Sequence, residues 1–326
     1  MAHDEIKHQF DSLAWLESQG LIERKILLLD LNFWIQMAKS ETELQRELKD
    51  RIAELVSSRR LVCPVSPSLL MELGKQPPSP SRDIQSGFMD DFSCGMSVKI
   101  GPRIFPMEYE AAANGETLPR EVVFSHFFDA MNEQPFAFES PSVLPEEIAR
   151  AAADILFENQ AQMSITHFMN TRFSRGIDPA VSRMSTNFRE MAKLHQNWSK
   201  NHTMPRQQIE NGELLSLLLS SFPEISPVIQ STNTMTRSLE ILDNCPTFWC
   251  IYKAFSALRW GGTVRENDFF DVLNLAPAIP YVDCAAGDRG TRHILKNLLD
   301  TEQRFNNRIV ASESELLQWL TEEFQD

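Results

Sequence analysis

The stretch from Glu266 to Asp288 constrains the fold more than any other part of the chain, and it reads ENDFFDVLNLAPAIPYVDCAAGD. Asp268 and Asp271 are three residues apart, so they lie on one face of the helix that this stretch predicts. Two prolines then end the helix, and YVDCAA predicts a short buried strand. Asp288 follows that strand at its carboxyl end, where ligands bind in an open α/β sheet. Because carboxylates held close together repel each other, this stretch indicates a cation-binding site.

Two earlier strands bring further acids. The run KILLLDLN (25–32) is continuously apolar up to Asp30, which is typical of a strand buried on both faces of a parallel sheet. LVCPV (61–65) predicts a second strand, and the helix SPSLLMELGK follows it with a serine as N-cap and Glu72 on its first turns. Each of these strands is thus followed by an acid.

This alternation predicts an α/β fold, a Rossmann-like parallel sheet of about five strands flanked by helices. The expected elements are helices at 4–19, 41–58, 289–305 and 312–324, a third strand at 97–106, and a late strand in NNRIVAS. Between them the sequence predicts mostly helices, at 145–169, 180–198, 210–222 and 245–260. We therefore expect a single domain over residues 1–326, with a core at 22–110 and 246–326 and a large helical insertion at 111–245.

Composition limits the classes of function. The formal net charge of −14 disfavours binding of nucleic acid by bulk charge, although it leaves room for a local basic track. The five cysteines are odd in number and widely spaced, which predicts reduced thiols in a cytoplasmic protein. The sequence has no stretch of the length and apolarity of a membrane span, so we expect no membrane association.

A local basic track lies between Thr166 and Arg206, where aromatic residues are interleaved with cations. Basic and aromatic side chains together are how proteins hold single strands. The alternative is a solvated helix face whose aromatics belong to the core. The candidate residues for nucleic-acid binding are Arg172, Arg175, Arg183, Arg189, Lys193, Lys200 and Arg206, and the aromatics are Phe168, Phe173, Phe188 and Trp198.

The strand ending in Asp30, the helix carrying Glu72 and the late NDFFD…PYVD…GD block together resemble the PIN-domain nucleases. The resemblance covers roughly residues 22–110 and 246–326. It implies a PIN-like fold and a site for Mg²⁺ or Mn²⁺. The implied catalytic, metal-binding acids are Asp30, Glu72, Asp271 and Asp288, with Asp268 and Asp283 as accessory metal ligands. Gly287 departs from the family, which often has Thr or Ser before the last acid.

The function implied by this resemblance is metal-dependent endoribonuclease action on single-stranded RNA. Such domains often act as toxins or in phage defence, and the expected partners are RNA and a protein partner or a second copy of the chain. The chemistry agrees with the residues. Hydrolysis of a phosphodiester needs a nucleophile near neutral pH and stabilised phosphoryl charge, which divalent cations on carboxylates provide.

Two alternatives stay open. A PIN-like fold can lose its metal and serve as a catalytically inactive module that binds RNA or protein, with Asp30 merely capping a helix. LLLDLN and AAGD also resemble motifs of haloacid-dehalogenase-type phosphatases. That second alternative requires an aspartate where this chain has Asn32, and it gives Glu72 no role.

Overall fold

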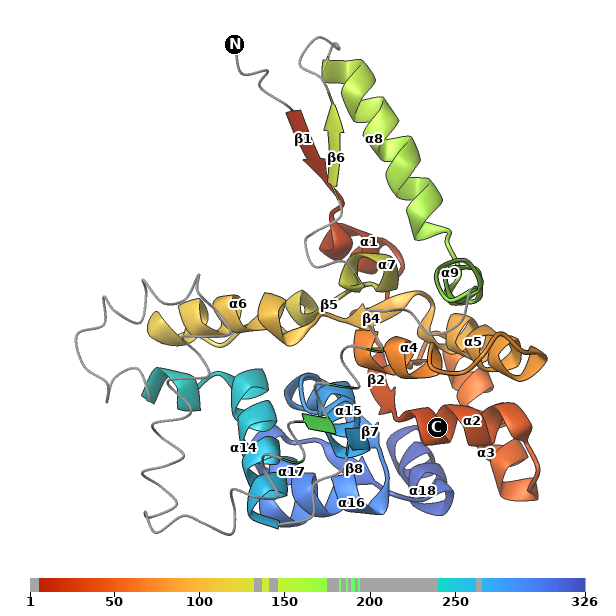
Figure 1. Ribbon diagram of the computed structural model, residues 1–326, viewed down its shortest axis with the longest axis vertical. Helices are drawn as coiled ribbons and strands as arrows, with labels where there is room; N and C mark the ends of the chain where they lie inside the picture. The colour runs from red at the N-terminus through yellow and green to blue at the C-terminus, as the bar shows by residue number, and fades with distance from the viewer. Residues whose placement is uncertain are drawn as a thin grey trace.

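The computed structural model describes residues 6–131, 137–140, 146–174, 182, 186, 189–190, 193, 240–261 and 266–325 (Figure 1). Its centre is a four-stranded parallel sheet in the order β3, β2, β7, β8. The strands are β2 (Lys25–Leu29), β3 (Leu61–Val62), β7 (Cys284–Ala286) and β8 (Arg308–Val310). Helices flank this sheet, which confirms the expected α/β class.

The two ends of the chain meet inside the sheet. β2 pairs with β7 in the register Leu27 to Cys284, and β7 pairs with β8 in the register Cys284 to Arg308. On the other side of β2, β3 is followed by β4 (Met96–Val98), which approaches through a single parallel bridge between Val65 and Ser97. The early strands therefore extend the sheet in one direction and the late strands in the other. The order reverses between β2 and β7.

Both faces of the sheet are buried, as its apolar strands predict. Ile26 and Leu28 point into one apolar cluster, whereas Leu27 and Leu29 point into the other. The first cluster is covered by α6 (Gly101–Ala113), α14 (Pro246–Gly261) and α15 (Glu266–Leu275). The second is covered by α2 (Leu31–Lys39), α3 (Glu43–Ser57), α4 (Pro67–Leu73), α5 (Pro80–Ser93) and α18 (Glu313–Glu323).

The helix ends follow local chemistry. Thr42 and Gln45 form a capping box at the start of α3, and Ser66 caps α4 ahead of Pro67. After β7, Asp288 caps the short α16 (Arg289–Arg292), which continues as the π-helical η3 (His293–Leu298) and then α17 (Thr301–Phe305). The 3-10 turn η2 (Ile279–Tyr281) joins α15 to β7.

The N-terminal residues differ from the single helix expected at 4–19. β1 (Ile6–Gln9) precedes α1 (Ser12–Ser18), and Asp11 caps α1 between them. β1 pairs antiparallel with β6 (Ala137–Ser140), so its partner lies far along the chain. Local periodicity cannot reveal such a pairing, because the backbone hydrogen bonds of β1 go to a distant segment.

The region expected as a helical insertion contains strands as well as helices. The 3-10 turn η1 (Arg120–Val123) leads into β5 (Phe124–His126), which pairs antiparallel with β4, and α7 (Phe127–Ala130) follows. The helix expected at 145–169 is divided into α8 (Glu146–Ala161) and α9 (Ile165–Arg172). The helix expected at 245–260 is α14, whereas those expected at 180–198 and 210–222 lie outside the continuously described segments. The division into core and insertion stays a prediction.

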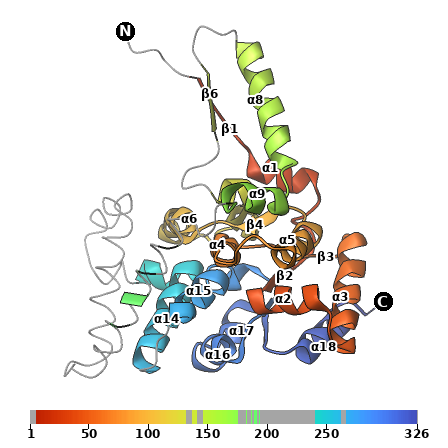
Figure 2. The ribbon, with the colours of Figure 1, turned by 45° about the vertical axis from the view of Figure 1, so that its right-hand side comes forward.

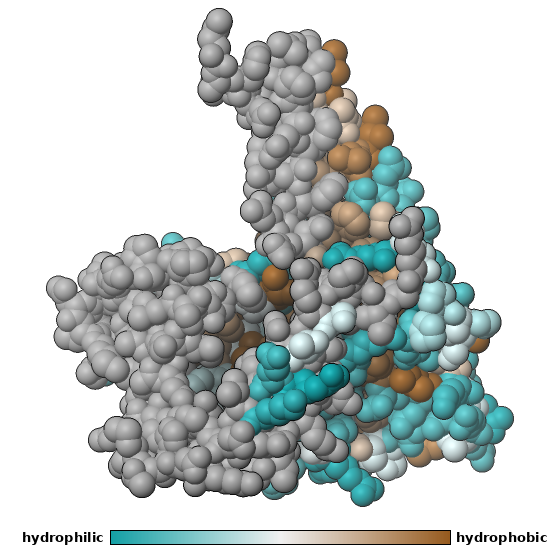
Figure 3. All heavy atoms as spheres, in the orientation of Figure 1, coloured by the Kyte–Doolittle hydropathy of each residue, from teal (hydrophilic) through white to brown (hydrophobic). Residues whose placement is uncertain are grey.

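β1, β6 and α8 form an arm that projects from the rest of the molecule (Figures 1 and 2). Hydrophobic residues show on the outer side of this arm in Figure 3. Ile148 and Ile155, on α8, are 56% and 62% exposed. Among the described helices, none combines the length and the apolar character that a bilayer span requires. All five cysteines carry free thiols.

Helix α9 is held by hydrogen bonds to α5 and by packing against the end of α4. Both carboxylate oxygens of Asp90 accept hydrogen bonds at its start, from the amides of Ile165 and Thr166. The buried Arg82 donates to the carbonyl oxygen of Phe173 at its end. The Phe173 ring packs on Gly74, where a Cβ would lie 2.7 Å from the ring carbon Cε1. The region between 111 and 245 thus reaches the end of α4.

Candidate metal centre

Asp30 stands immediately after β2, at the point where the strand order reverses. It occupies the N-cap position of α2, yet its side chain makes no capping hydrogen bond. Its Oδ1 instead accepts from Nδ2 of Asn274 at 3.2 Å, and its Oδ2 from Nδ2 of Asn32 at 3.2 Å. The Asp30 carboxylate is thus 2% exposed and held by two side-chain amides, and it does not act as a helix cap.

Two further acids converge on Asp30. Glu72 comes from α4 and Asp271 from α15, two helices that cover opposite faces of the sheet and meet at its carboxyl edge. One carboxylate oxygen of each residue lies within 4.8 Å of the others, a spacing that can hold a metal ion. We call Asp30, Glu72 and Asp271 the carboxylate triad. Glu72 lies near the carboxyl end of the short α4, not on its first turns as the sequence predicted.

The triad carries mutual repulsion. Burial, followed by the charges of Asp30, Asp288, Glu72 and Asp268, raises the pKa of Asp271 to about 8. Burial also raises the pKa of Asp30 and of Glu72, and the charge of Asp30 adds to the shift of Glu72. One buried and two half-buried carboxylates supply the oxygen ligands that a hard divalent cation prefers.

Asp288 and Asp268 border the triad without belonging to it. Asp288 is exposed and caps α16, with its Oδ1 accepting from the Thr291 amide at 2.6 Å. Its charge nevertheless raises the pKa of Asp30 and of Asp271, so it lies within electrostatic reach of both. Asp268 and Asp271 share one face of α15, as the sequence predicted.

Asp268, Asp271 and Asp288 line one pocket of about 360 Å³, which we call the acidic pocket. Its remaining wall is largely apolar and comes from α14, α15 and η3, through Ala257, Leu258, Val272, Ile294 and Leu298. Asp271 lines this pocket and also belongs to the triad, so the pocket reaches the triad at this residue. A ligand there would meet carboxylates on one side and an apolar surface on the other.

Asp283 is not brought to the triad. It precedes β7, whereas Asp288 follows β7, so the two lie at opposite edges of the sheet. Its carboxylate accepts from Nζ of Lys25 at 3.2 Å and Nη1 of Arg120 at 3.3 Å, and from the Ile26 amide at 2.8 Å. The extended strand β7 keeps the two residues apart, so the accessory metal role expected for Asp283 has no geometric support.

Sequence reasoning missed Asn274, which orients Asp30. Asn274 is 1% exposed, and its Oδ1 accepts a hydrogen bond from Oγ of Ser66 while its Nδ2 donates to Asp30. Its position three residues after Asp271 was the available signal, because this spacing places both on one face of α15. Asn32, which departs from the phosphatase motif, also holds Asp30 through a hydrogen bond.

Gly287 has a packing explanation. A Cβ at this position would lie 2.8 Å from Cδ1 of Leu275, which is itself buried. The residue before Asp288 is therefore small because α15 packs closely against the end of β7. Thr291 supplies a hydroxyl-bearing residue nearby, and it lines the acidic pocket.

The expected basic track is described only in part. Arg172, Arg189 and Lys193 are exposed, while Arg175, Arg183, Lys200 and Arg206 lie outside the described residues. Phe168 and Phe173 are buried among the core aromatics, so they are not available for stacking on bases. Phe188 and Trp198 also fall outside the described residues.

No protein-family model matches the chain, and comparison with curated proteins and with solved structures finds no match either. The resemblance to PIN-domain nucleases therefore rests on the residues alone.

Proposed function

We propose that this chain is a divalent-cation-dependent nuclease with a PIN-like fold, and that it cleaves phosphodiester bonds of single-stranded RNA. The observation that carries the proposal is the carboxylate triad, in which oxygens of Asp30, Glu72 and Asp271 lie within 4.8 Å of one another. The triad sits where the strand order reverses, at the carboxyl edge of a parallel sheet. Ligands of open α/β folds bind in this place.

The residues divide the work as follows. Asp30, Glu72 and Asp271 would hold Mg²⁺ or Mn²⁺, and Asn274 keeps the Asp30 carboxylate oriented. Once bound, such a cation lowers the pKa of water and stabilises negative charge on phosphoryl oxygens. Asp268 and Asp288 face the acidic pocket, where they border the path of the substrate.

The choice of substrate is supported by the shape of the acidic pocket and by the family resemblance. Carboxylates with a bound cation attract a phosphate, and the apolar wall of Leu258, Ile294 and Leu298 suits a sugar or base. A toxin or phage-defence role is an extension of the same resemblance.

The test is Mn²⁺-dependent cleavage of a single-stranded RNA by the full chain. Asp30→Asn and Asp271→Asn should each abolish cleavage and greatly weaken Mn²⁺ binding in calorimetry, because each removes a charged ligand. Asp50→Asn, an exposed aspartate on α3, is the matched control and should behave as wild type. Wild-type protein that neither binds Mn²⁺ nor cleaves RNA would refute the proposal and favour a catalytically inactive PIN-like module that binds RNA or protein.

The phosphatase alternative is separated by the same preparation. It requires a second aspartate at position 32, where Asn32 instead donates to Asp30. Hydrolysis of small phosphate monoesters without cleavage of RNA would favour it over the nuclease.

A further inference from the structure

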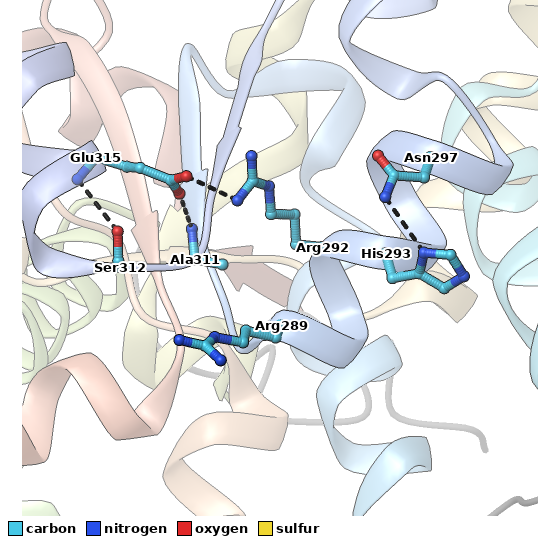
Figure 4. Close-up of a pocket in the computed structure, with 7 residues that line it drawn as sticks. All are labelled: Arg289, Arg292, His293, Asn297, Ala311, Ser312 and Glu315. Carbon is cyan, nitrogen blue, oxygen red and sulfur yellow. Dashed lines mark hydrogen bonds and ion pairs between the residues drawn. The ribbon is translucent and has the colours of Figure 1, made fainter.

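A second pocket adjoins the acidic one, on the other side of α16 and η3. It encloses about 530 Å³ between this segment and the start of α18. Its lining is shown in Figure 4 and consists of Arg289, Arg292, His293, Asn297, Ala311, Ser312 and Glu315. We call it the arginine pocket.

The arginine pocket has an excess of positive charge. Its one acid, Glu315, pairs with Nη1 of Arg292 at 2.7 Å, and its second oxygen accepts from the Ala311 amide at 2.8 Å. The Ala311 amide is the main reason that the pKa of Glu315 is lowered. In Figure 4 the side chains of Arg289 and Arg292 extend to the same side of their helix; Arg292 reaches Glu315, whereas Arg289 lies apart from it. Glu315 is thus already engaged, and the charge of Arg289 remains to face a ligand.

The two pockets are neighbours along the same short segment. His293 lines both, and Arg289 directly follows Asp288, which lines the acidic pocket. Gly290 and Thr291, between Arg289 and Arg292, also line the acidic pocket. A cationic and an anionic cavity are therefore separated by only the thickness of α16 and η3.

Two arginines that line one pocket are suited to phosphate, because each guanidinium presents its N–H donors in a planar fork. A polyanion also needs such a counter-charge here, since the chain is acidic overall and the acidic pocket repels phosphates before a cation binds. A strand lying across α16 would place one phosphate at the carboxylates and another at the arginines.

We propose that the arginine pocket binds a backbone phosphate of the same single strand whose neighbouring phosphodiester lies at the carboxylate triad. This inference rests on the proposed nuclease function for the identity of the strand. Arg289 is the main phosphate ligand, and Arg292 contributes while remaining paired with Glu315. A free anion such as inorganic phosphate shares the chemistry and would compete for the pocket.

The test measures binding apart from cleavage. A fluorescently labelled oligouridylate is titrated with wild type, Arg289→Glu and Arg289→Ala in EDTA at several salt concentrations. The matched control is Arg46→Glu, which reverses an exposed arginine on α3, outside both pockets. Inorganic phosphate is then used as a competitor, and a thermal unfolding scan verifies that each variant is folded.

We expect Arg289→Glu to weaken RNA binding by about ten-fold or more, with a smaller loss for Arg289→Ala and none for Arg46→Glu. For the Arg289 variants, the slope of log affinity against log salt concentration should be smaller by roughly 0.7, the contribution of one phosphate contact on a single strand. Inorganic phosphate should displace RNA from wild type more effectively than from Arg289→Ala.

Equal affinity and salt slope for wild type, Arg289→Glu and Arg46→Glu would overturn the inference, as would wild type that binds no RNA. If the variants lose only their response to inorganic phosphate and keep wild-type RNA affinity, the pocket is a site for free anions, and the inference is overturned too. If wild type cleaves RNA but the Arg289 variants bind RNA as well as wild type does, only the proposed role of the arginine pocket is refuted. Loss of binding in Arg289→Glu without any Mn²⁺-dependent cleavage would remove only the nuclease.

Discussion

Asn274 donates a hydrogen bond from its Nδ2 to Oδ1 of Asp30 at 3.2 Å, across 244 residues of sequence. This bond joins α15 to the end of β2, the two elements that supply Asp271 and Asp30 to the triad. Ser66, which caps α4, in turn donates to Asn274, so the helix carrying Glu72 is joined to the same amide. The buried Asn274 side chain therefore connects the three elements that supply the acids of the triad.

We expect Asn274→Leu to weaken Mn²⁺ binding by about 10- to 100-fold, the usual effect of removing a partner that orients a metal ligand. It should also lower the free energy of unfolding by about 1–3 kcal/mol, because Asp30 and Ser66 each lose a buried partner. Calorimetry with Mn²⁺ and urea unfolding measure the two effects. Asn244→Leu, which changes an exposed asparagine, serves as control. Wild-type Mn²⁺ affinity in Asn274→Leu would show that Asp30 needs no orienting amide.

Mn²⁺ affinity should rise with pH up to about 8. The pKa of Asp271 is raised to about 8 by burial and by its acidic neighbours, so at lower pH a proton occupies this ligand. A cation that displaces one proton loses up to about ten-fold in affinity for each pH unit below the pKa. Calorimetric titrations across this range measure the slope, and Asp271→Asn should flatten it.

In the cation-free protein, the raised pKa of Asp271 affects stability, and this effect has the opposite dependence on pH. Unfolded Asp271 releases its proton near its ordinary pKa of 3.8, whereas the folded protein holds it to about 8. Between these values the folded state binds more protons, so the free energy of unfolding falls as pH rises. A metal-free protein whose stability is independent of pH in this window would contradict the assignment of a raised pKa to Asp271.

Asp283→Asn should lower stability and leave Mn²⁺ affinity unchanged. The side chain pairs with Lys25 and Arg120 at the amino edge of the sheet, where both partners are partly solvated, so a loss of about 1 kcal/mol is expected. Asp271→Asn is the paired variant with the reverse outcome, weaker Mn²⁺ binding. A marked drop in Mn²⁺ affinity for Asp283→Asn would return this residue to the metal site.

Gly74→Ala should destabilise the protein by about 1–3 kcal/mol, because its Cβ would lie within 2.9 Å of three carbons of the Phe173 ring. Gly87→Ala is a matched control on α5, since a Cβ there meets nothing within 4 Å. That change should stabilise by roughly 0.5–1 kcal/mol through helix propensity. Chemical unfolding measures both, and the double variant Gly74→Ala, Phe173→Leu should recover part of the loss. Equal effects of the two alanines would exclude the close contact.

Much of the core could be predicted from the sequence because its strands are buried on both faces. Residues 26–29 and 284–287 are buried without exception, so these strands and the acids beside them are visible in the local sequence. The rule that ligands bind at the carboxyl ends of parallel strands predicted that Asp288 lies near Asp30, whereas the role of Asp271, on the helix before β7, came from the family resemblance. The position of Asp283 at the other edge followed from where β7 begins, and strand boundaries are the least certain part of such a prediction.

The remaining features depend on partners distant in sequence. β1 is recognisable only through its pairing with β6, and β5 only through its pairing with β4. Asn274 has no apolar or charge pattern of its own, and its role arises from meeting Asp30. The arginine pocket requires η3 and α18 to be adjacent, which no local periodicity reveals.

The contact of Phe173 with Gly74 has a consequence for shortening the chain. Removing residues 111–245 to obtain a minimal core would uncover the outer side of α4 and leave the buried Arg82 without the carbonyl of Phe173. The helix that presents Glu72 would then have an apolar flank in water, and Arg82 on the neighbouring α5 would lose two acceptors, the Phe173 carbonyl and the Asn170 side chain. A truncated protein should therefore lose its cation site even with every acidic ligand retained, so the middle of the chain is no dispensable appendage.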